Sequence, residues 1–138
     1  MSDLKLYVEK WTPVVRSIMR IFIALLFMEH GAQKLFAFPA AMDSLNGGTV
    51  AILSLLGVAA VLELFGGLFI LLVLFTRPVA FILSGQMATA YFMVHAPMGF
   101  WPALNHGELA IIYCFIFFYL AFAGGGSISL DRRLRKIN

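Results

Sequence analysis

Thiols and metal-binding patterns are scarce in this chain of 138 residues, which contains a single cysteine, Cys114. An intramolecular disulfide or a dithiol relay needs two thiols, so a self-contained disulfide-exchanging enzyme is excluded. The three histidines show no i,i+3 or i,i+4 spacing and no H-x-x-x-H motif, so we expect no metal site. The sequence also lacks a flavin fingerprint and a haem motif. These absences argue against autonomous redox catalysis and leave open whether the protein is an enzyme.

Charged residues are also scarce, at 12% of the chain, whereas 62% of the residues are hydrophobic. A soluble domain of average composition is roughly half apolar and about a quarter charged. The composition therefore predicts an integral membrane protein whose 138 residues form one domain, with the lipid bilayer as a partner. Nothing in the distribution of basic residues indicates a nucleic-acid surface.

Four apolar segments are each close to the roughly twenty residues that an α-helix needs to cross a bilayer. They run from about 13 to 38, 49 to 75, 78 to 95 and 108 to 123. Thr12 is placed to cap the first helix, with Pro13 at its first helical position. Asn105 is placed to cap the fourth helix, with Glu108 at the capping-box spacing. A basic tail follows, from 127 to 138.

The basic residues predict the orientation, because they concentrate on the cytoplasmic side of membrane proteins. Lys and Arg occur towards the N-terminus, in the second loop and in the tail, whereas the first and third loops contain none. Both termini are therefore expected to be cytoplasmic. Short connections favour antiparallel neighbours, so the predicted fold is an all-α, antiparallel four-helix bundle. Small residues on the second and third helices are predicted to pack inward: Ala59, Ala60, Gly66, Gly67, Ser84, Gly85 and Ala88.

Four polar residues interrupt the first apolar segment towards its end: Glu29, His30, Gln33 and Lys34. At about 100° per residue they fall within an arc of roughly 140° on the helix. An ionised group in hydrocarbon costs several kcal/mol, so such groups normally face a bundle interior or a wet cavity. We interpret these residues as candidates for ligand binding and proton exchange. The structural alternatives are a charge pair that fixes helix register and a Lys34 that reaches the outer headgroups.

Glu63 is predicted to lie near mid-membrane in the second helix, flanked by apolar residues. Burial disfavours an isolated carboxylate unless a cation approaches, and Lys34 or Arg20 could do so from the first helix. The functional interpretation of Glu63 is a carboxyl that accepts protons or orients a ligand. The alternative is a protonated Glu63 bonded to a backbone carbonyl or to Gln86, which is itself a further candidate for ligand binding or proton exchange. His95 is expected at the level of the polar arc, where it either joins the site or is merely interfacial.

Four short motifs follow one another at characteristic spacing along the chain. They are Gly31-x-x-Lys34-Leu35, Glu63-Leu64-Phe65-Gly66-Gly67, Phe75-Thr76-Arg77-Pro78 and Gly126-Ser127-Ile128-Ser129-Leu130-Asp131. Together they resemble the DoxX family of small four-helix bacterial membrane proteins, and the likeness covers about 20 to 134. The resemblance implies a multi-pass protein of the bacterial inner membrane. Some relatives are linked to thiosulfate:quinone oxidoreduction, and others to membrane complexes that protect against oxidative stress.

The polar arc and the resemblance lead to one functional expectation. The protein would be a redox-associated membrane subunit that binds a quinone, a sulfur species or a similar small molecule in a polar pocket open to the outer side. Lys34 would attract an anionic or carbonyl oxygen, Glu29 and His30 would exchange protons, and Glu63 would orient the inner edge. The cofactor this implies is a quinone, and the implied partner is a redox protein or a second copy of the chain. The alternatives are a transporter subunit for a small solute or protons, and a structural scaffold of a membrane complex.

Overall fold

The computed structural model describes residues 3–128, and the regular structure within this range is helical throughout, without a strand. Residues 129–138, which hold most of the predicted basic tail, lie outside the described residues. The all-α class expected from the sequence is confirmed for the described part of the chain.

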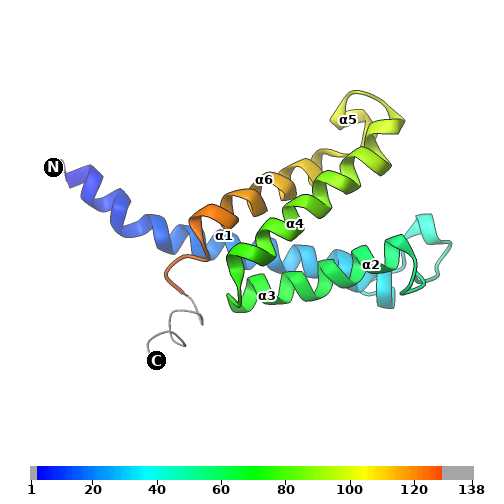
Figure 1. Ribbon diagram of the computed structural model, residues 1–138, viewed down its shortest axis with the longest axis horizontal. Helices are drawn as coiled ribbons and strands as arrows, with labels where there is room; N and C mark the ends of the chain where they lie inside the picture. Colours follow the sequence, from blue (N-terminus) through cyan, green and yellow to red (C-terminus); the bar gives the residue numbers. More distant parts are fainter. Residues whose placement is uncertain (1–2, 129–138) are drawn as a thin grey trace. The chain divides into compact units, whose positions relative to one another are not determined.

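The chain forms two compact units, one of residues 3–76 with 125–128 and one of residues 77–124. The first contains α1 (Asp3–Phe36), the 3-10 turn η1 (Asp43–Leu45), α2 (Leu55–Val61), the π-helical η2 (Leu62–Gly66) and α3 (Gly67–Leu72) (Figure 1). The second contains α4 (Thr76–Ala90), the π-helical η3 (Tyr91–His95), the 3-10 turn η4 (Ala96–Met98), α5 (Pro102–Asn105) and α6 (Glu108–Ala123).

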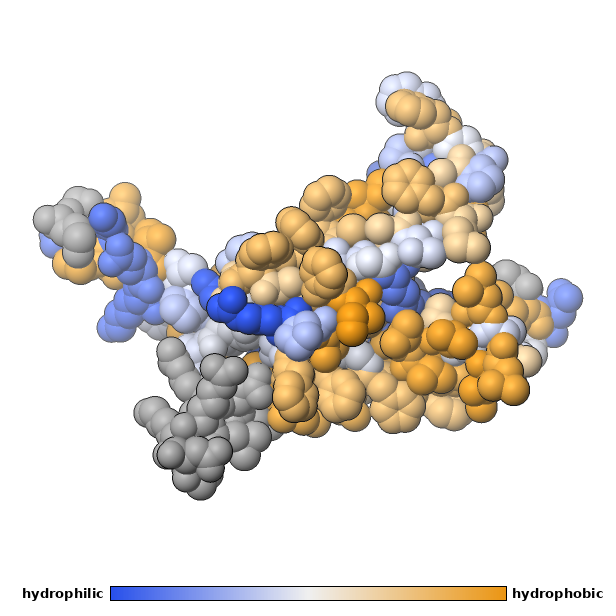
Figure 2. All heavy atoms as spheres, in the orientation of Figure 1, coloured by the Kyte–Doolittle hydropathy of each residue, from blue (hydrophilic) through white to orange (hydrophobic). Residues whose placement is uncertain are grey.

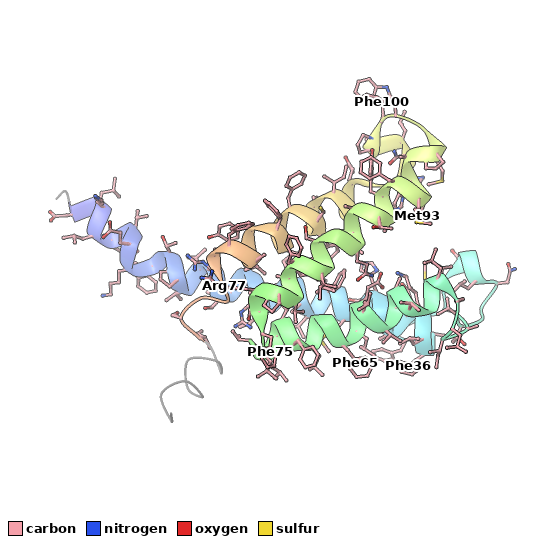
Figure 3. All side chains as sticks on the ribbon, in the orientation of Figure 1. Phe36, Phe65, Phe75, Arg77, Met93 and Phe100 are labelled. Atoms are coloured by element: carbon pink, nitrogen blue, oxygen red, sulfur yellow. The ribbon has the colours of Figure 1, made fainter. Side chains whose placement is uncertain are left out.

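Within residues 3–128, three helical segments are long and apolar enough to cross a membrane: Asp3–Phe36, Leu55–Leu72 and Thr76–Met98. The remaining long helix, α6, is apolar but has only 16 residues. The visible face of α2 and α3 is almost wholly apolar (Figure 2), and the exposed rings of Phe65 and Phe75 point away from the ribbon (Figure 3). Exposed apolar surface of this extent is unfavourable in water and favourable in lipid. The protein is a multi-helix membrane protein, compatible with a helical bundle.

Helix α1 begins at Asp3, ten residues before the predicted start, and Pro13 lies inside it. The predicted N-cap does not form, because the Thr12 hydroxyl instead donates to Val8 O, one turn back, at 2.7 Å. Pro13 removes one backbone N–H without ending the helix, and Ser17 Oγ donates to the Pro13 carbonyl at 2.9 Å. Proline suits the first turn of a helix and can also be tolerated inside one. In α1 the residues on both sides of Pro13 are helical, so Pro13 occupies an interior position.

The second spanning segment begins at Leu55 and not near Thr49, because Ser54 caps it. The Ser54 hydroxyl accepts a hydrogen bond from Gly57 N at 3.0 Å and donates to Ala51 O at 2.6 Å. At the other end the segment stops at Leu72, since Val73 adopts a left-handed conformation with φ 57°. Both ends therefore lie inside the apolar run, where hydropathy gives no signal of a boundary.

In the second unit, α6 runs from Glu108 to Ala123, the bounds expected from the sequence. Its start is built differently from the predicted capping box. The Asn105 side chain is fully buried, accepts a hydrogen bond from Gly107 N at 2.8 Å and donates to Gly99 O at 2.7 Å. Asn105 therefore closes the loop before the helix and does not bond to the backbone of Glu108.

Helix α1 packs along α2, η2 and α3 through small residues. A Cβ on Gly31 would lie 2.6 Å from Leu64 N and 2.7 Å from Ala60 O, so the two backbones nearly touch there. A Cβ on Gly67 would lie 2.6 Å from Met28 Cγ. Close backbone approach of this kind is how helices associate in lipid, where no hydrophobic force drives them together. The inward packing predicted for Ala60 and Gly67 is confirmed.

The same prediction is wrong for Gly85 on α4. This glycine is exposed, and a Cβ placed on it would meet no heavy atom within 4 Å. Its neighbour Ser84 is buried as predicted, and its hydroxyl donates to Cys114 O on α6 at 2.9 Å. The small residues of α4 predicted an inward face that included Gly85. The inward face of α4 instead includes Ser84, whose hydroxyl bonds to α6.

Candidate functional site

Lys34 and Glu63 form a buried ion pair between the last turn of α1 and η2. Lys34 Nζ lies 2.6 Å from Glu63 Oε1 and 2.7 Å from Oε2, so the ammonium donates to both oxygens of the carboxylate. The Glu63 side chain is 4% exposed and that of Lys34 is 18% exposed. Of the two cations that could approach Glu63 from the first helix, Lys34 is the one that does so.

The local backbone brings these two side chains together. Gly31 lies one turn before Lys34, and its lack of a side chain lets α1 approach the backbone at Leu64. Glu63 itself lies in a π-helical turn, Leu62–Gly66, a widened arrangement that is frequent at functional sites. The backbone carbonyl of Lys34 accepts a hydrogen bond from Val50 N at 3.0 Å, which links the end of α1 to the following loop. The position of the ammonium is thus fixed from both sides.

The chemistry available to this pair follows from its unequal burial. Removing two charges from water is costly, and their attraction offsets that cost only with good geometry, which the two short hydrogen bonds provide. An ammonium has three N–H donors, and within residues 3–128 Lys34 uses two of them on Glu63. The partly exposed end of Lys34 therefore retains a donor with which it could bind a carbonyl or anionic oxygen.

The other predicted residues of α1 are placed less favourably. Glu29 is exposed, whereas His30 and Gln33 are half-buried. Glu29 precedes Lys34 by five residues, which turns it about 140° away around the helix. The structure therefore separates Glu29 from the Lys34–Glu63 pair, although sequence spacing grouped them on one arc.

Gln86 and His95 belong to the second unit. Gln86 is half-buried on α4. His95 ends η3, where its Nδ1 lies 2.9 Å from Asn105 O and its ring stacks on Tyr91 with a centroid distance of 6.4 Å. These contacts give His95 a local structural role at the loop before α6. In the described part of the chain no group of three His, Cys, Asp or Glu side chains could hold a metal ion.

Arg20 is a buried charged residue whose role the sequence reasoning missed. Its side chain is 1% exposed, and its guanidinium donates to four backbone carbonyls. Nη1 donates to Ile70 O at 2.7 Å and Leu71 O at 2.6 Å, Nε to Gly125 O at 2.9 Å, and Nη2 to Ile128 O at 3.1 Å. The last carbonyls of a helix lack partners within it, so Arg20 satisfies the end of α3 and binds the segment after α6 to it.

The signal for Arg20 was an arginine inside an apolar run, which predicts a buried partner. The sequence suggested Glu63 as that partner, yet the planar fork of a guanidinium can be satisfied by neutral carbonyls alone. Those carbonyls come from backbone that is 50 to 108 residues away along the chain. Backbone acceptors leave no trace in a sequence, so no motif could have identified them.

The fold and the site define a class of protein. It is a helical membrane protein with a lysine–glutamate pair buried between its first two spanning segments. A family model described as DoxX matches residues 15–96, which include Arg20, Lys34 and Glu63. An uncharacterized protein of Haemophilus influenzae is 42% identical over 131 residues, covering 93% of this chain and 96% of the relative. The chain belongs to the DoxX family, as its motifs indicated. No solved structure matches it.

Proposed function

We propose that the protein is a redox-associated membrane subunit that binds a small oxygen-bearing molecule, a quinone or a sulfur oxyanion, at the Lys34–Glu63 pair. The observation that carries this proposal is the ion pair in which Lys34 bonds to both carboxylate oxygens of Glu63. The Glu63 side chain is 4% exposed and that of Lys34 is 18% exposed, so the ammonium is the more accessible group. An ionic pair buried between apolar spanning segments supports a functional role, since a hydrophobic pair of similar volume would span the membrane as well.

The roles follow from the donors and acceptors present. Lys34 offers its remaining N–H to a quinone carbonyl or a sulfur oxyanion, as a charge-assisted hydrogen bond. Glu63 holds the ammonium in place and can receive a proton from it or from the ligand. His30, half-buried one turn before Lys34, is the proposed proton-exchanging residue of α1, with Glu29 at the edge of the site. Gln33, half-buried on the same helix, completes the polar lining proposed on α1.

The proposed topology is an antiparallel four-helix bundle in the bacterial inner membrane with both termini in the cytoplasm. The pairing of α1 with the second segment supports it, since Lys34 meets Glu63 while Arg20, earlier in α1, meets Ile70 and Leu71, later in the second segment. The positive-inside rule places the Arg20 end on the cytoplasmic side. The ligand pocket then opens outward, and a redox protein or a second copy of the chain is the proposed partner.

Binding is favoured over conduction by the residues between the two buried charges of α1. The buried positions from Arg20 to Lys34 are Ala24, Phe27 and Gly31, none of which can carry a proton or hydrate an ion. A proton or solute path past Glu63 would need polar groups at those positions. The buried positions of α1 between Arg20 and Lys34 therefore offer no polar path that a transported proton or solute could follow inward.

Titration of purified protein in detergent with a short-chain ubiquinone and, separately, with thiosulfate tests the proposal. We expect one of the two probes to bind, and Lys34→Ala or Glu63→Gln to weaken that binding about tenfold or more, because each removes a charge-assisted contact or its support. Circular dichroism and gel filtration identify preparations in which the variant is still folded.

Lys10→Ala and Glu108→Gln are matched controls, because they remove the same kinds of charge from exposed positions. Both should bind as the unchanged protein does. Equal affinity in all four variants, or no binding of either probe, would contradict the proposed site. A single stoichiometric partner in a pull-down, unaffected by Lys34→Ala and Glu63→Gln, would instead support the scaffold alternative.

A further inference from the structure

Helix α1 is longer than a bilayer requires. Its 34 residues, at 1.5 Å of rise each, extend about 50 Å, whereas the hydrocarbon core is about 30 Å thick. The first ten residues, 3–12, are all exposed and project beyond the part of α1 that packs on α2 and α3 (Figure 1). About four turns of helix in total must therefore lie outside the hydrocarbon, and residues 3–12 supply most of them.

The apolar residues of this projecting segment form one stripe. Leu4, Tyr7, Val8 and Trp11 follow the i, i+3, i+4, i+7 spacing of a single helical face, and Val15 continues it into the spanning part. At about 100° per residue the five side chains occupy an arc of about 100°. All five are exposed, Leu4 by 71% and Tyr7 by 62%. An apolar stripe of this kind is unfavourable in water and has no partner within residues 3–128.

Charged residues are arranged around the stripe as they are in helices that lie on membranes. Lys5 and Lys10 fall on its two sides, each roughly 110° from its centre, while Glu9 falls on the opposite face. Lysines at such boundary positions can extend their ammonium groups to lipid phosphates while their methylene stems cover apolar surface. Leu6 is the exception, as it lies on the polar face.

Tyr7 and Trp11 give the stripe an aromatic centre. Their ring centroids are 6.1 Å apart, one helical turn from each other, with both rings exposed. Tyrosine and tryptophan are enriched where the hydrocarbon meets the headgroups, because each ring is amphipathic. Pro13 follows directly, and its missing N–H weakens the helix at the point where the projecting segment joins the spanning part.

We infer that residues 3–12 form an interfacial helix, bent from the spanning part at Pro13, that lies on the headgroup region of an anionic leaflet with the Leu4–Tyr7–Val8–Trp11 stripe inserted. The occupant of the stripe is the phospholipid surface. The inference rests on the membrane placement of α1 and is independent of any ligand at Lys34 and Glu63.

Depth-dependent fluorescence quenching of Trp11 tests this inference in the full chain. Trp101→Phe leaves Trp11 as the one tryptophan, since the sequence has two. The protein is reconstituted into vesicles of phosphatidylcholine and phosphatidylglycerol in which some lipids carry bromine either high or low on their acyl chains. We expect a blue-shifted Trp11 emission and quenching by the high bromines about twofold stronger than by the low ones.

Two substitutions on opposite faces provide the matched comparison. Val8→Glu places a charge in the stripe and should reduce quenching by the high bromines about twofold or more, whereas Leu6→Glu on the polar face should leave it unchanged. Red-shifted emission without quenching would mean that the segment projects into water, and overturns the inference. Blue-shifted emission insensitive to either bromine position would mean that another protein surface covers the stripe, and overturns it equally.

Discussion

The two buried cations of α1 differ in what surrounds them. Arg20 and Lys34 are 14 residues apart, about 21 Å along the helix, and both reach the second spanning segment. Arg20 is 1% exposed and uses four of its five N–H donors on uncharged backbone carbonyls. Lys34 is partly exposed and has a carboxylate as its partner.

This difference separates a structural charge from a chemical one. A guanidinium keeps its proton at every accessible pH and here has almost no donor left for a ligand. The ammonium of Lys34 has three N–H donors, gives two hydrogen bonds to Glu63 and is 18% exposed, so it retains a donor at its partly exposed end. Hydropathy does not distinguish these two basic residues of α1. Lys34 has a donor left for a ligand, whereas Arg20 has almost none.

The largest effect on stability is expected from Arg20→Met. The substitution removes the charge and its four hydrogen bonds, leaving the carbonyls of α3 and of residues 125–128 buried without these donors. The expected loss is about 3–5 kcal/mol in the free energy of unfolding. Thermal unfolding in detergent measures it. Arg20→Lys keeps the charge but not the planar guanidinium, so its stability should lie between those of Arg20→Met and the unchanged protein. Equal stability of the two variants and the unchanged protein would refute the structural role of Arg20.

Lys34→Met is expected to have a smaller effect, about 2–3 kcal/mol, because Lys34 is partly solvated while Glu63 remains buried without its counter-ion. Adding Glu63→Leu should recover most of this stability, since a hydrophobic pair can replace an ionic one. Ligand binding should stay lost in the double variant. Stability lost in the double variant as fully as in Lys34→Met would show that the pair serves the fold.

Gly31→Ala should destabilise by about 1–2 kcal/mol, because its Cβ would collide with the backbone of Leu64 and Ala60. The matched control is Gly85→Ala, whose Cβ meets nothing within 4 Å and should stabilise α4 by up to about 1 kcal/mol. Opposite shifts in the unfolding temperature are thus expected from one chemical change. Shifts of the same sign would mean that the approach of α1 to the second segment is looser than the structure has it.

The smallest effect is expected from Glu29→Gln. Its side chain is exposed, so stability should change by no more than about 0.5 kcal/mol. Probe affinity should also be kept, because the proposed binding groups are Lys34 and Glu63, and Glu29 lies at the edge of the proposed site. A loss of binding as large as that of Lys34→Ala would show that Glu29 belongs to its centre.

What the sequence could predict depended on whether the determinant was local. The ends of α6 could be read from Glu108 and from the glycines after Ala123. One tertiary contact was also suggested, because a buried Glu63 favours a nearby cation and the first helix offers Lys34 and Arg20. The start of α1 was placed at Pro13 because proline suits both a first turn and a tolerated interior position. Local rules were sound wherever a single arrangement satisfied them.

The rest depended on tertiary partners. The carbonyl acceptors of Arg20 are backbone atoms distant in sequence, so nothing marked them. Glu29 and Lys34 share an arc on a helical wheel, but only Lys34 faces the second segment. A wheel gives the angle between two side chains and does not tell which of them points at the neighbouring helix.

The hydrogen bonds of Arg20 also set an order of events during biosynthesis. Arg20 is synthesised before all four of its acceptors, and two of them, Gly125 O and Ile128 O, follow it by 105 and 108 residues. Until then its guanidinium has only the carbonyls at the end of α3. The complete set of hydrogen bonds around Arg20 can therefore form only after the chain has been synthesised as far as Ile128.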